Sequence, residues 1–200
     1  MINSNSRKIL TNTPLGKRHL KEVLGSTFAG LILSPQEIWL VTAWFTDFEI
    51  LDNRSGNWSY LNASWGNRMV TFIELLETAV LNGCKLNLVV NETKTNDSAL
   101  SLLKNKLVNE DGFRFEISDK VHIKGLVTES CFFDGSMNFT FSGANRNDEL
   151  VTISGDTHQI STTRIDFSNL YFKNYQQKTK AIENPVVEIE EDEDDEHDFF

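Results

Sequence analysis

The chain has 200 residues, 40% of them hydrophobic, and a formal net charge of −10. This length and apolar content favour a single domain with one sizeable core. The polar N-terminal segment does not resemble a signal peptide, and no apolar run approaches the roughly 20 residues that cross a bilayer. These features argue against a membrane protein, and we expect a soluble, cytoplasmic one.

The negative charge is concentrated at the C-terminus. Residues 183–200 contain ten acidic residues and no Lys or Arg, and they end in Phe199 and Phe200. Residues 1–182 carry nineteen acidic and nineteen basic residues, so that part of the chain is neutral. A densely acidic segment repels itself and has no apolar face to bury. We therefore expect one domain over residues 1–182 and a disordered acidic tail over residues 183–200.

The cysteines and histidines do not form a pattern that is typical of metal sites. Cys84 and Cys131 each lie near a predicted strand, which favours buried free thiols over a disulfide. The histidines are scattered and no HExxH pattern occurs; they are His19, His122, His158 and His197. We expect no metal and no cofactor.

The predicted elements alternate between helices and strands. Apolar residues at helical spacing predict helices over residues 16–29, 69–82, 97–107 (capped by Asp97 or Ser98) and 165–175. Apolar runs rich in β-branched and aromatic residues predict strands over residues 37–45, 85–90 and 113–117, with several short strands between 121 and 155. This alternation indicates an α/β fold with a mixed sheet.

A long loop is predicted over residues 52–67. This segment is dense in Asn, Ser and Gly, and Trp58, Tyr60 and Trp65 punctuate it. Such a composition is typical of a loop that aromatic side chains anchor to the domain. Loops of this length in compact domains are often functional.

The segment from Val121 to Glu149 holds the candidate catalytic residues. Three short patterns follow one another in it: His122-x-Lys124, Gly135-Ser136-x-Asn138 and Asn147-x-Glu149. Together they resemble the HxKxxxxD and GSxN signature of the phospholipase D superfamily and the NxE that often follows it. This resemblance implies a phospholipase-D-like mixed β-sheet flanked by helices. It covers roughly residues 36–175.

The segment departs from that signature in two places. Glu129 stands where the family usually has Asp, and the spacer from there to GSxN is one residue shorter. In the family this Asp is a supporting residue, and Glu129, Gly135 and Asn147 are expected to have supporting roles here.

The resemblance implies catalysis without a metal ion. A phosphodiester is anionic, so the transferring oxygens need fixed donors, which Lys124, Ser136 and Asn138 would supply. His122 would attack phosphorus and form a phosphohistidine. Its other ring nitrogen must then hold a proton, and Glu149 is the expected orienting partner.

The sequence contains only one HxK pattern, whereas members of the superfamily use two. One histidine attacks phosphorus and the other protonates the leaving oxygen. A symmetric pair of chains would supply both, so we expect a homodimer. Small single-motif members resemble DNA nucleases, and this sequence is also similar to the phospholipase-D-like subunit of deazapurine DNA-modification clusters. These resemblances imply a DNA nuclease in phage defence or restriction.

Three functions stay open at this point. The first is DNA cleavage through His122, and the second is a non-cleaving subunit that grips nucleic acid within a helicase or restriction complex. The third is phospholipase D-type lipid hydrolysis. The acidic tail is open as well, because it could be a solubilising appendage, dock a helicase or restriction partner, or occupy the DNA groove.

Overall fold

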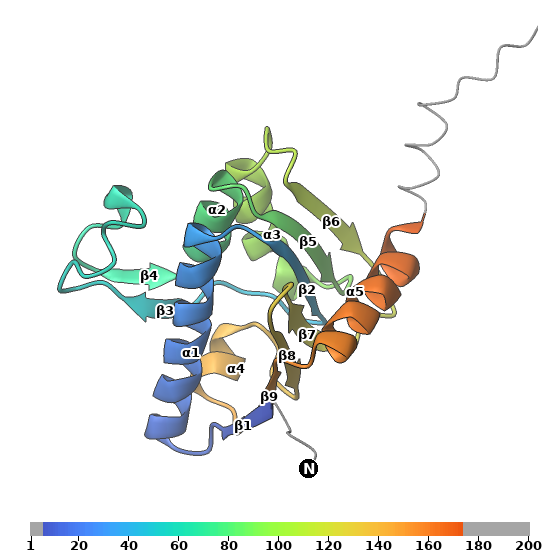
Figure 1. Ribbon diagram of the computed structural model, residues 1–200, viewed down its shortest axis with the longest axis horizontal. Coiled ribbons are helices and arrows are strands. Elements are labelled where there is room, and N and C mark those ends of the chain that lie inside the picture. The colour runs from blue at the N-terminus through green and yellow to red at the C-terminus, as the bar shows by residue number, and fades with distance from the viewer. Residues whose placement is uncertain (1–5, 174–200) are drawn as a thin grey trace, which may run out of the picture.

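A seven-stranded mixed sheet forms the centre of the protein (Figure 1). The computed structural model describes residues 6–173. The strand order is β1-β9-β8-β7-β2-β5-β6, in which β2, β5 and β6 are parallel and the other neighbours are antiparallel. The strands are β1 (Ser6–Leu10), β2 (Glu37–Thr42), β5 (Lys85–Val90), β6 (Phe113–Ile117), β7 (Lys124–Val127), β8 (Phe132–Gly135) and β9 (Leu150–Ser154). The predicted α/β fold with a mixed sheet is confirmed.

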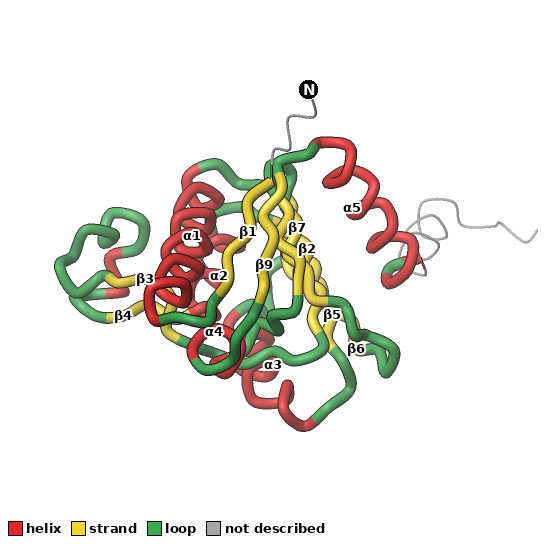
Figure 2. Tube along the Cα trace, turned by 90° about the horizontal axis from the view of Figure 1, so that it is seen from below, coloured by secondary structure: helices red, strands yellow, loops and turns green. Residues whose placement is uncertain are grey.

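Helices cover both faces of the sheet unequally. The helices are α1 (Pro14–Leu33), α2 (Phe72–Leu81), α3 (Lys94–Lys106), α4 (Phe141–Asn145) and α5 (Thr157–Tyr171). Figure 2 shows α5 alone on one side of the sheet, with α1, α2 and α3 on the other. None of the helices within residues 6–173 is long and apolar enough to cross a membrane.

Strand β2 is buried on both faces, as predicted from its apolar sequence. Ile38 and Leu40 join the larger core under α1 and α2, whereas Trp39 and Val41 point into the smaller core under α5. This alternation follows from the two-residue period of a strand. In the larger core, the ring of Phe72 stacks on that of Phe139 with centroids 5.6 Å apart.

Several predicted boundaries were wrong because local capping signals were missed. The helix expected from residue 69 begins at Phe72, since the Thr71 side chain and Glu74 form a capping box. Thr93 caps α3, four residues before the expected Asp97. Helix α5 begins at Thr157 rather than residue 165, with Asp156 as its cap.

The predicted loop over residues 52–67 belongs to a hairpin that projects from the domain at the left of Figure 1. Strands β3 (Glu49–Asp52) and β4 (Met69–Thr71) pair in an antiparallel manner and form a sheet of their own. Residues 53–68 project between them and include a short 3-10 helix, Ala63–Trp65. We call residues 53–68 the arm. The expected acidic tail, and with it the domain boundary at residue 182, lies outside the described residues.

Candidate active site

His122 and Lys124 flank the start of β7. Lys124 is the first residue of the strand, whereas His122 lies in the preceding loop and is exposed. The Lys124 ammonium donates to the carbonyl oxygen of His122 over 2.7 Å, and its Nζ lies 3.4 Å from the imidazole Nδ1. His122 and Lys124 are therefore in direct contact at the start of the strand.

Asn138 lies beside the end of β2. Its Oδ1 accepts hydrogen bonds from the backbone N–H of Trp44 at 3.2 Å and from the Thr42 hydroxyl at 3.4 Å. Thr42 is fully buried and also accepts the N–H of Phe139 at 3.4 Å. The stacking of Phe139 on Phe72 anchors the same segment to the core. The orientation of the Asn138 amide is thus fixed by two hydrogen bonds to its oxygen, on a segment that Phe139 anchors.

Ser136 and Glu149 are brought together between β8 and β9. The Ser136 hydroxyl donates to the carboxylate of Glu149 and accepts the N–H of Leu150 at 3.1 Å. The other oxygen of Glu149 accepts from Asn147 Nδ2 at 3.1 Å. Glu149 is 7% exposed, and its own N–H donates to the Thr11 hydroxyl at 2.8 Å.

The expected orienting contact between Glu149 and His122 is not among the hydrogen bonds of residues 6–173. The Glu149 carboxylate is held instead by Ser136 and Asn147. The only side chain that contacts the His122 ring by a polar interaction, in the described part of the chain, is Lys124.

The backbone conformation at residue 135 explains why glycine occupies this position of the GSxN pattern. Its φ of +146° is in a region that L side chains rarely adopt. A Cβ atom there would also lie 2.0 Å from the carbonyl oxygen of Leu150. Glycine therefore permits the close approach of β8 to β9 that positions Ser136.

The sheet register brings these groups to one edge. Lys124 is paired with Thr42 across β7 and β2, and Thr42 contacts Asn138. Lys124 and Gly135 also line the same small hollow. His122, Lys124, Ser136, Asn138 and Glu149 thus lie at the edge of the sheet where β2 and β8 end and where β7 and β9 begin.

Glu129 lies away from this edge. It lies in the turn between β7 and β8. The length of β7 by itself places this turn about 10 Å from Lys124. Its carboxylate accepts the N–H of Glu37 at 3.2 Å and lies 3.7 Å from Arg164. These contacts tie the turn to β2 and α5, so Glu129 contacts structural residues rather than the candidate catalytic groups.

Two buried threonines support the site and were not predicted. Thr42 holds Asn138, and Thr11 accepts the N–H of Glu149. A signal for Thr42 exists in the sequence, because it is a polar residue in an otherwise apolar strand. Thr11 follows β1, a short mixed-polarity strand that the sequence analysis did not predict.

The site offers positive and neutral donors. Lys124 supplies an ammonium and Asn138 an amide, which suits the binding of a phosphate group, whereas the single proton of the Ser136 hydroxyl is donated to Glu149. No group of three or more His, Cys, Asp or Glu side chains that could hold a metal ion occurs within residues 6–173. Cys84 and Cys131 are free, and burial raises the pKa of both thiols.

A profile of the family described as "Cardiolipin synthase, PLD-like domain" matches residues 58–171, which is more than half of the chain. The chain belongs to the PLD-like domain family. The match contains the entire segment from His122 to Glu149, so the resemblance to the phospholipase D superfamily is confirmed. The sequence matches no curated protein.

Solved structures with this fold include two proteins that are matched over nearly their whole length. NucT from Helicobacter pylori has a TM-score of 0.56 and 13% identity, over 82% of this chain and 94% of that one. Nuc from Salmonella typhimurium, a phospholipase D family member, has a TM-score of 0.55 and 14% identity, over 82% of this chain and 91% of that one.

An archaeal chromatin protein has a related fold. TrmBL2, which is described as having a novel mode of DNA binding, has a TM-score of 0.51 and 12% identity. The alignment spans 89% of this chain but only 54% of TrmBL2. At these identities the three structures establish similarity of fold alone.

Proposed function

We propose that the protein is a metal-independent phosphodiesterase that cleaves DNA with His122 as the nucleophile. The observation that supports it most is the convergence of the Lys124 ammonium and the Asn138 amide beside His122 at one edge of the sheet. The ammonium would neutralise charge on the phosphoryl oxygens, and the amide would donate to one of them. The similarity of the fold to NucT and Nuc favours a nuclease over other phosphodiesterases.

In the proposed reaction, Nε2 of His122 attacks phosphorus and the bond from phosphorus to the leaving oxygen breaks. A second histidine gives its proton to that oxygen. Water then attacks the phosphohistidine, the same second histidine takes the proton of that water, and the phosphorus–nitrogen bond breaks. Side chains of the protein carry out both proton transfers and stabilise the charge on the phosphoryl oxygens.

This chemistry requires His122 to change its contact with Lys124. For Nε2 to attack, Nδ1 must carry the proton, but an ammonium has no lone pair with which to accept it. We propose that Lys124 turns toward the bound phosphate and that the exposed His122 ring turns toward Glu149, which is the acceptor that the family resemblance implies. Ser136 would then release one carboxylate oxygen of Glu149 for this contact.

The second histidine is proposed to come from a second copy of the chain in a homodimer. Large apolar side chains are exposed on segments next to the site, as expected of an interface. Trp44 is hydrogen-bonded through its N–H to Asn138, Ile123 lies between His122 and Lys124, and Phe141 begins α4. A two-fold axis at this edge would bury these side chains and bring two copies of His122 together.

Trapping of the covalent intermediate tests this function. Wild-type protein quenched during the cleavage of labelled DNA should carry DNA on a bond that acid breaks and alkali does not, as expected of phosphorus–nitrogen linkages. His122→Ala should carry none, whereas the control His158→Ala, which alters an exposed histidine of α5, should behave as wild type. Turnover by folded His122→Ala would contradict the proposal.

A second candidate is a subunit that grips DNA without cutting it. The absence of a Glu149–His122 hydrogen bond among the described residues favours it, as does the similarity of the fold to a DNA-binding chromatin protein. This candidate predicts that DNA binds with unchanged affinity to His122→Ala and is never cleaved by the wild type. Cleavage of a phospholipid but not of DNA would instead support the lipid hydrolase.

We further propose a role in phage defence or DNA restriction, which rests on the resemblance to the subunit of deazapurine DNA-modification clusters. The acidic residues 183–200 would recruit a helicase or restriction partner through Phe199 and Phe200. If the protein protects its host against phage, that protection should be lost when His122→Ala replaces the wild type. Removal of Phe199 and Phe200 should abolish a pulldown of the partner and leave DNA affinity unchanged.

A further inference from the structure

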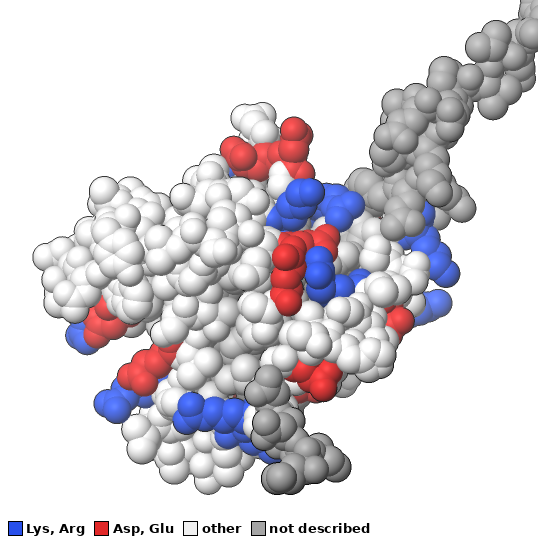
Figure 3. All heavy atoms as spheres, in the orientation of Figure 1, with Lys and Arg blue, Asp and Glu red and all other residues white. Residues whose placement is uncertain are grey.

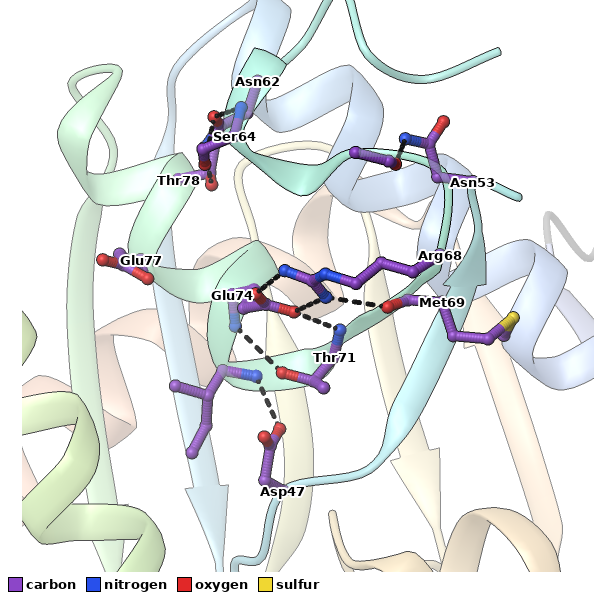
Figure 4. A network of polar contacts seen from close by, with 12 residues as sticks. Asp47, Asn53, Asn62, Ser64, Arg68, Met69, Thr71, Glu74, Glu77 and Thr78 are labelled. Atoms are coloured by element: carbon purple, nitrogen blue, oxygen red, sulfur yellow. Dashed lines mark hydrogen bonds and ion pairs between the residues drawn. The ribbon is translucent and has the colours of Figure 1, made fainter. Parts of the chain in front are cut away.

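Hydrogen bonds hold the arm in a defined conformation, although its sequence is typical of a loop (Figure 4). Asn53 is fully buried, and its amide donates to Ser59 and to the carbonyl of Gly66 and accepts the N–H of Trp58. At the far end of the arm, the Arg68 guanidinium donates to both carboxylate oxygens of Glu74. The Asn53 contacts close the arm on itself, and the Arg68 contacts tie its end to α2.

The middle of the arm is anchored to the domain as well. The Asn62 amide donates to the Thr78 hydroxyl of α2 over 3.0 Å (Figure 4). Trp65 is 2% exposed and belongs to the main hydrophobic core. The arm is therefore held in one conformation and presents a defined surface.

That surface is aromatic and uncharged. Residues 55–67 contain no Asp, Glu, Lys or Arg, and the part of Figure 3 that corresponds to the arm is white. Tyr60 is 68% exposed, and its ring lies 6.4 Å from that of Trp58 with an interplanar angle of 31°. Exposed rings on a rigid support, with Ser, Asn and Gly around them, are typical of surfaces that bind other molecules. Flat rings also stack on the bases of unpaired nucleic acid.

A groove of about 520 Å³ runs between the arm and α1. Its lining includes four basic and two acidic side chains, whereas residues 1–182 as a whole are neutral. They are Lys17, Arg18, Lys21, Arg54, Glu22 and Asp52. In Figure 3, charged side chains gather directly below this uncharged part of the arm. The groove therefore combines positive charge with the aromatic residue Trp58, which also lines it.

The two outermost cations are available for a ligand. Arg18 lies 3.3 Å from Glu22 and Arg54 lies 2.6 Å from Asp52, and all four side chains are more than half exposed. The Arg54 guanidinium lowers the pKa of the Asp52 carboxyl to about 2. Exposed ion pairs of this kind contribute little to stability, so each arginine can exchange its carboxylate for a phosphate.

The segment from Asn138 to Glu149 links the groove to the candidate active site. Lys21 donates to Asn145 Oδ1 over 2.8 Å, and Lys17 donates to the carbonyl of Arg146 over 3.1 Å. Both contacts lie on the middle of this segment, whose two ends belong to the site. Helix α4, which separates Asn138 from the groove, is only about 7 Å long.

We propose that the groove between α1 and the arm binds a single-stranded segment of the nucleic-acid substrate as it leads away from the site. Arg18 and Arg54 contact its phosphates, and its bases stack on Tyr60 and Trp58. This inference rests on the proposed function for the class of substrate, and it assigns a binding site outside the residues that carry the reaction.

The test measures binding in a His122→Ala background, where no DNA is consumed. The probe is a fluorescently labelled oligothymidine of about 12 nucleotides, long enough to reach from the site into the groove. Arg18→Ala with Arg54→Ala should weaken binding about tenfold and reduce the salt slope by about 1.4, because two phosphate contacts are lost. Tyr60→Ala should weaken binding about tenfold without a change in slope, and Tyr60→Phe should restore it.

The control variant Lys85→Ala with Lys106→Ala removes two cations at the opposite end of the sheet, one of which is also ion-paired. It should bind the oligonucleotide as the parent does. Unchanged affinity and salt slope in the Arg18/Arg54 variant, or equal losses in the control, would overturn the inference.

A small activated diester separates this inference from the proposed function. Bis(p-nitrophenyl) phosphate is too short to reach the arm, so the arm variants made in the wild-type background should cleave it at the wild-type rate. A wild type that cleaves neither diester nor DNA, while the arm variants still lose affinity, would contradict the proposed function and support the groove. If the wild type cleaves the diester and DNA normally and the groove variants lose no affinity, the result would support the proposed function and contradict the groove.

Discussion

The amide oxygen of Asn138 accepts the backbone N–H of Trp44, 3.2 Å away, and this contact decides which way the side chain faces. The Thr42 hydroxyl donates to the same oxygen. No hydrogen bond among residues 6–173 uses Nδ2 of Asn138, although the residue is 8% exposed. The amide is therefore oriented as a donor toward the site.

Asn138→Asp should lower kcat for a phosphodiester by about 10²–10³, because a carboxylate oxygen replaces the donor and repels the phosphate. The retained oxygen keeps the contact with Trp44, so the thermal unfolding temperature should change little. Steady-state kinetics and circular dichroism check both statements. Asn82→Asp, at the end of α2, serves as the control, and an equal loss in that variant would contradict the assigned role.

Removal of divalent metal should leave cleavage intact. The proposed charge stabilisation comes from Lys124 and Asn138, so enzyme dialysed against EDTA should keep its rate. Lys124→Ala should lose most of its activity and should not regain it on addition of magnesium. A wild-type rate that vanishes with EDTA and returns only with magnesium would refute the mechanism.

The exposed rim of the site should carry the dimer interface. Trp44→Asp with Phe141→Asp places two charges there, which should give a folded monomer without activity. Light scattering measures the mass and the small diester measures the rate. Leu170→Asp, an exposed apolar position on α5, should stay dimeric and active. Full activity of the monomeric variant would mean that one chain suffices.

Gly135→Ala should destabilise the protein by about 2–4 kcal/mol, since the added methyl meets the carbonyl of Leu150 and the backbone has a positive φ. Gly66→Ala is the matched control. Gly66 also has a positive φ, 59° with a ψ of −167°, but nothing lies within 4 Å of its added Cβ, so only the smaller cost of the backbone conformation is expected. Denaturant unfolding of both variants gives the comparison, and equal losses would remove the steric argument.

The local parts of the fold could be predicted from the sequence, and the long-range parts could not. Strand β2 was identified because nearly all its residues are apolar, and His122, Lys124 and Asn138 because they form patterns within 28 residues. Strand β1 was missed: it is short and mixed in polarity, and it forms by pairing with β9, far along the chain. Nothing local to Thr11 signals that it holds Glu149, 138 residues away.

The arm should loosen in acid. Hydrogen bonds from Arg68 lower the pKa of the Glu74 carboxyl below its ordinary value of 4.5. A lowered pKa means that the stabilisation is complete above pH 4.5 and is lost as the pH falls through the folded-state value. The pair is partly exposed, so its contribution is about 1 kcal/mol or less.

Limited proteolysis within residues 53–68 as a function of pH measures this loosening. Cleavage should increase below pH 4.5 in the wild type, whereas Glu74→Gln should be cleaved at one elevated rate at every pH. An arm whose protection does not depend on pH in the wild type would indicate that Asn53 and Trp65 hold it alone.

The geometry of Gly135 also bears on how such a protein diverges. Under the proposed function, a lineage that replaces His122 would lose the reaction but keep its folded shape, since that side chain is exposed and packs against nothing in the core. A lineage that replaces Gly135 loses the closeness of β8 and β9, and selection against unfolded protein removes it first. Descendants that no longer catalyse the reaction are therefore expected to retain the glycine and to vary at the histidine position. They can be recognised by a GSxN pattern without an HxK pattern.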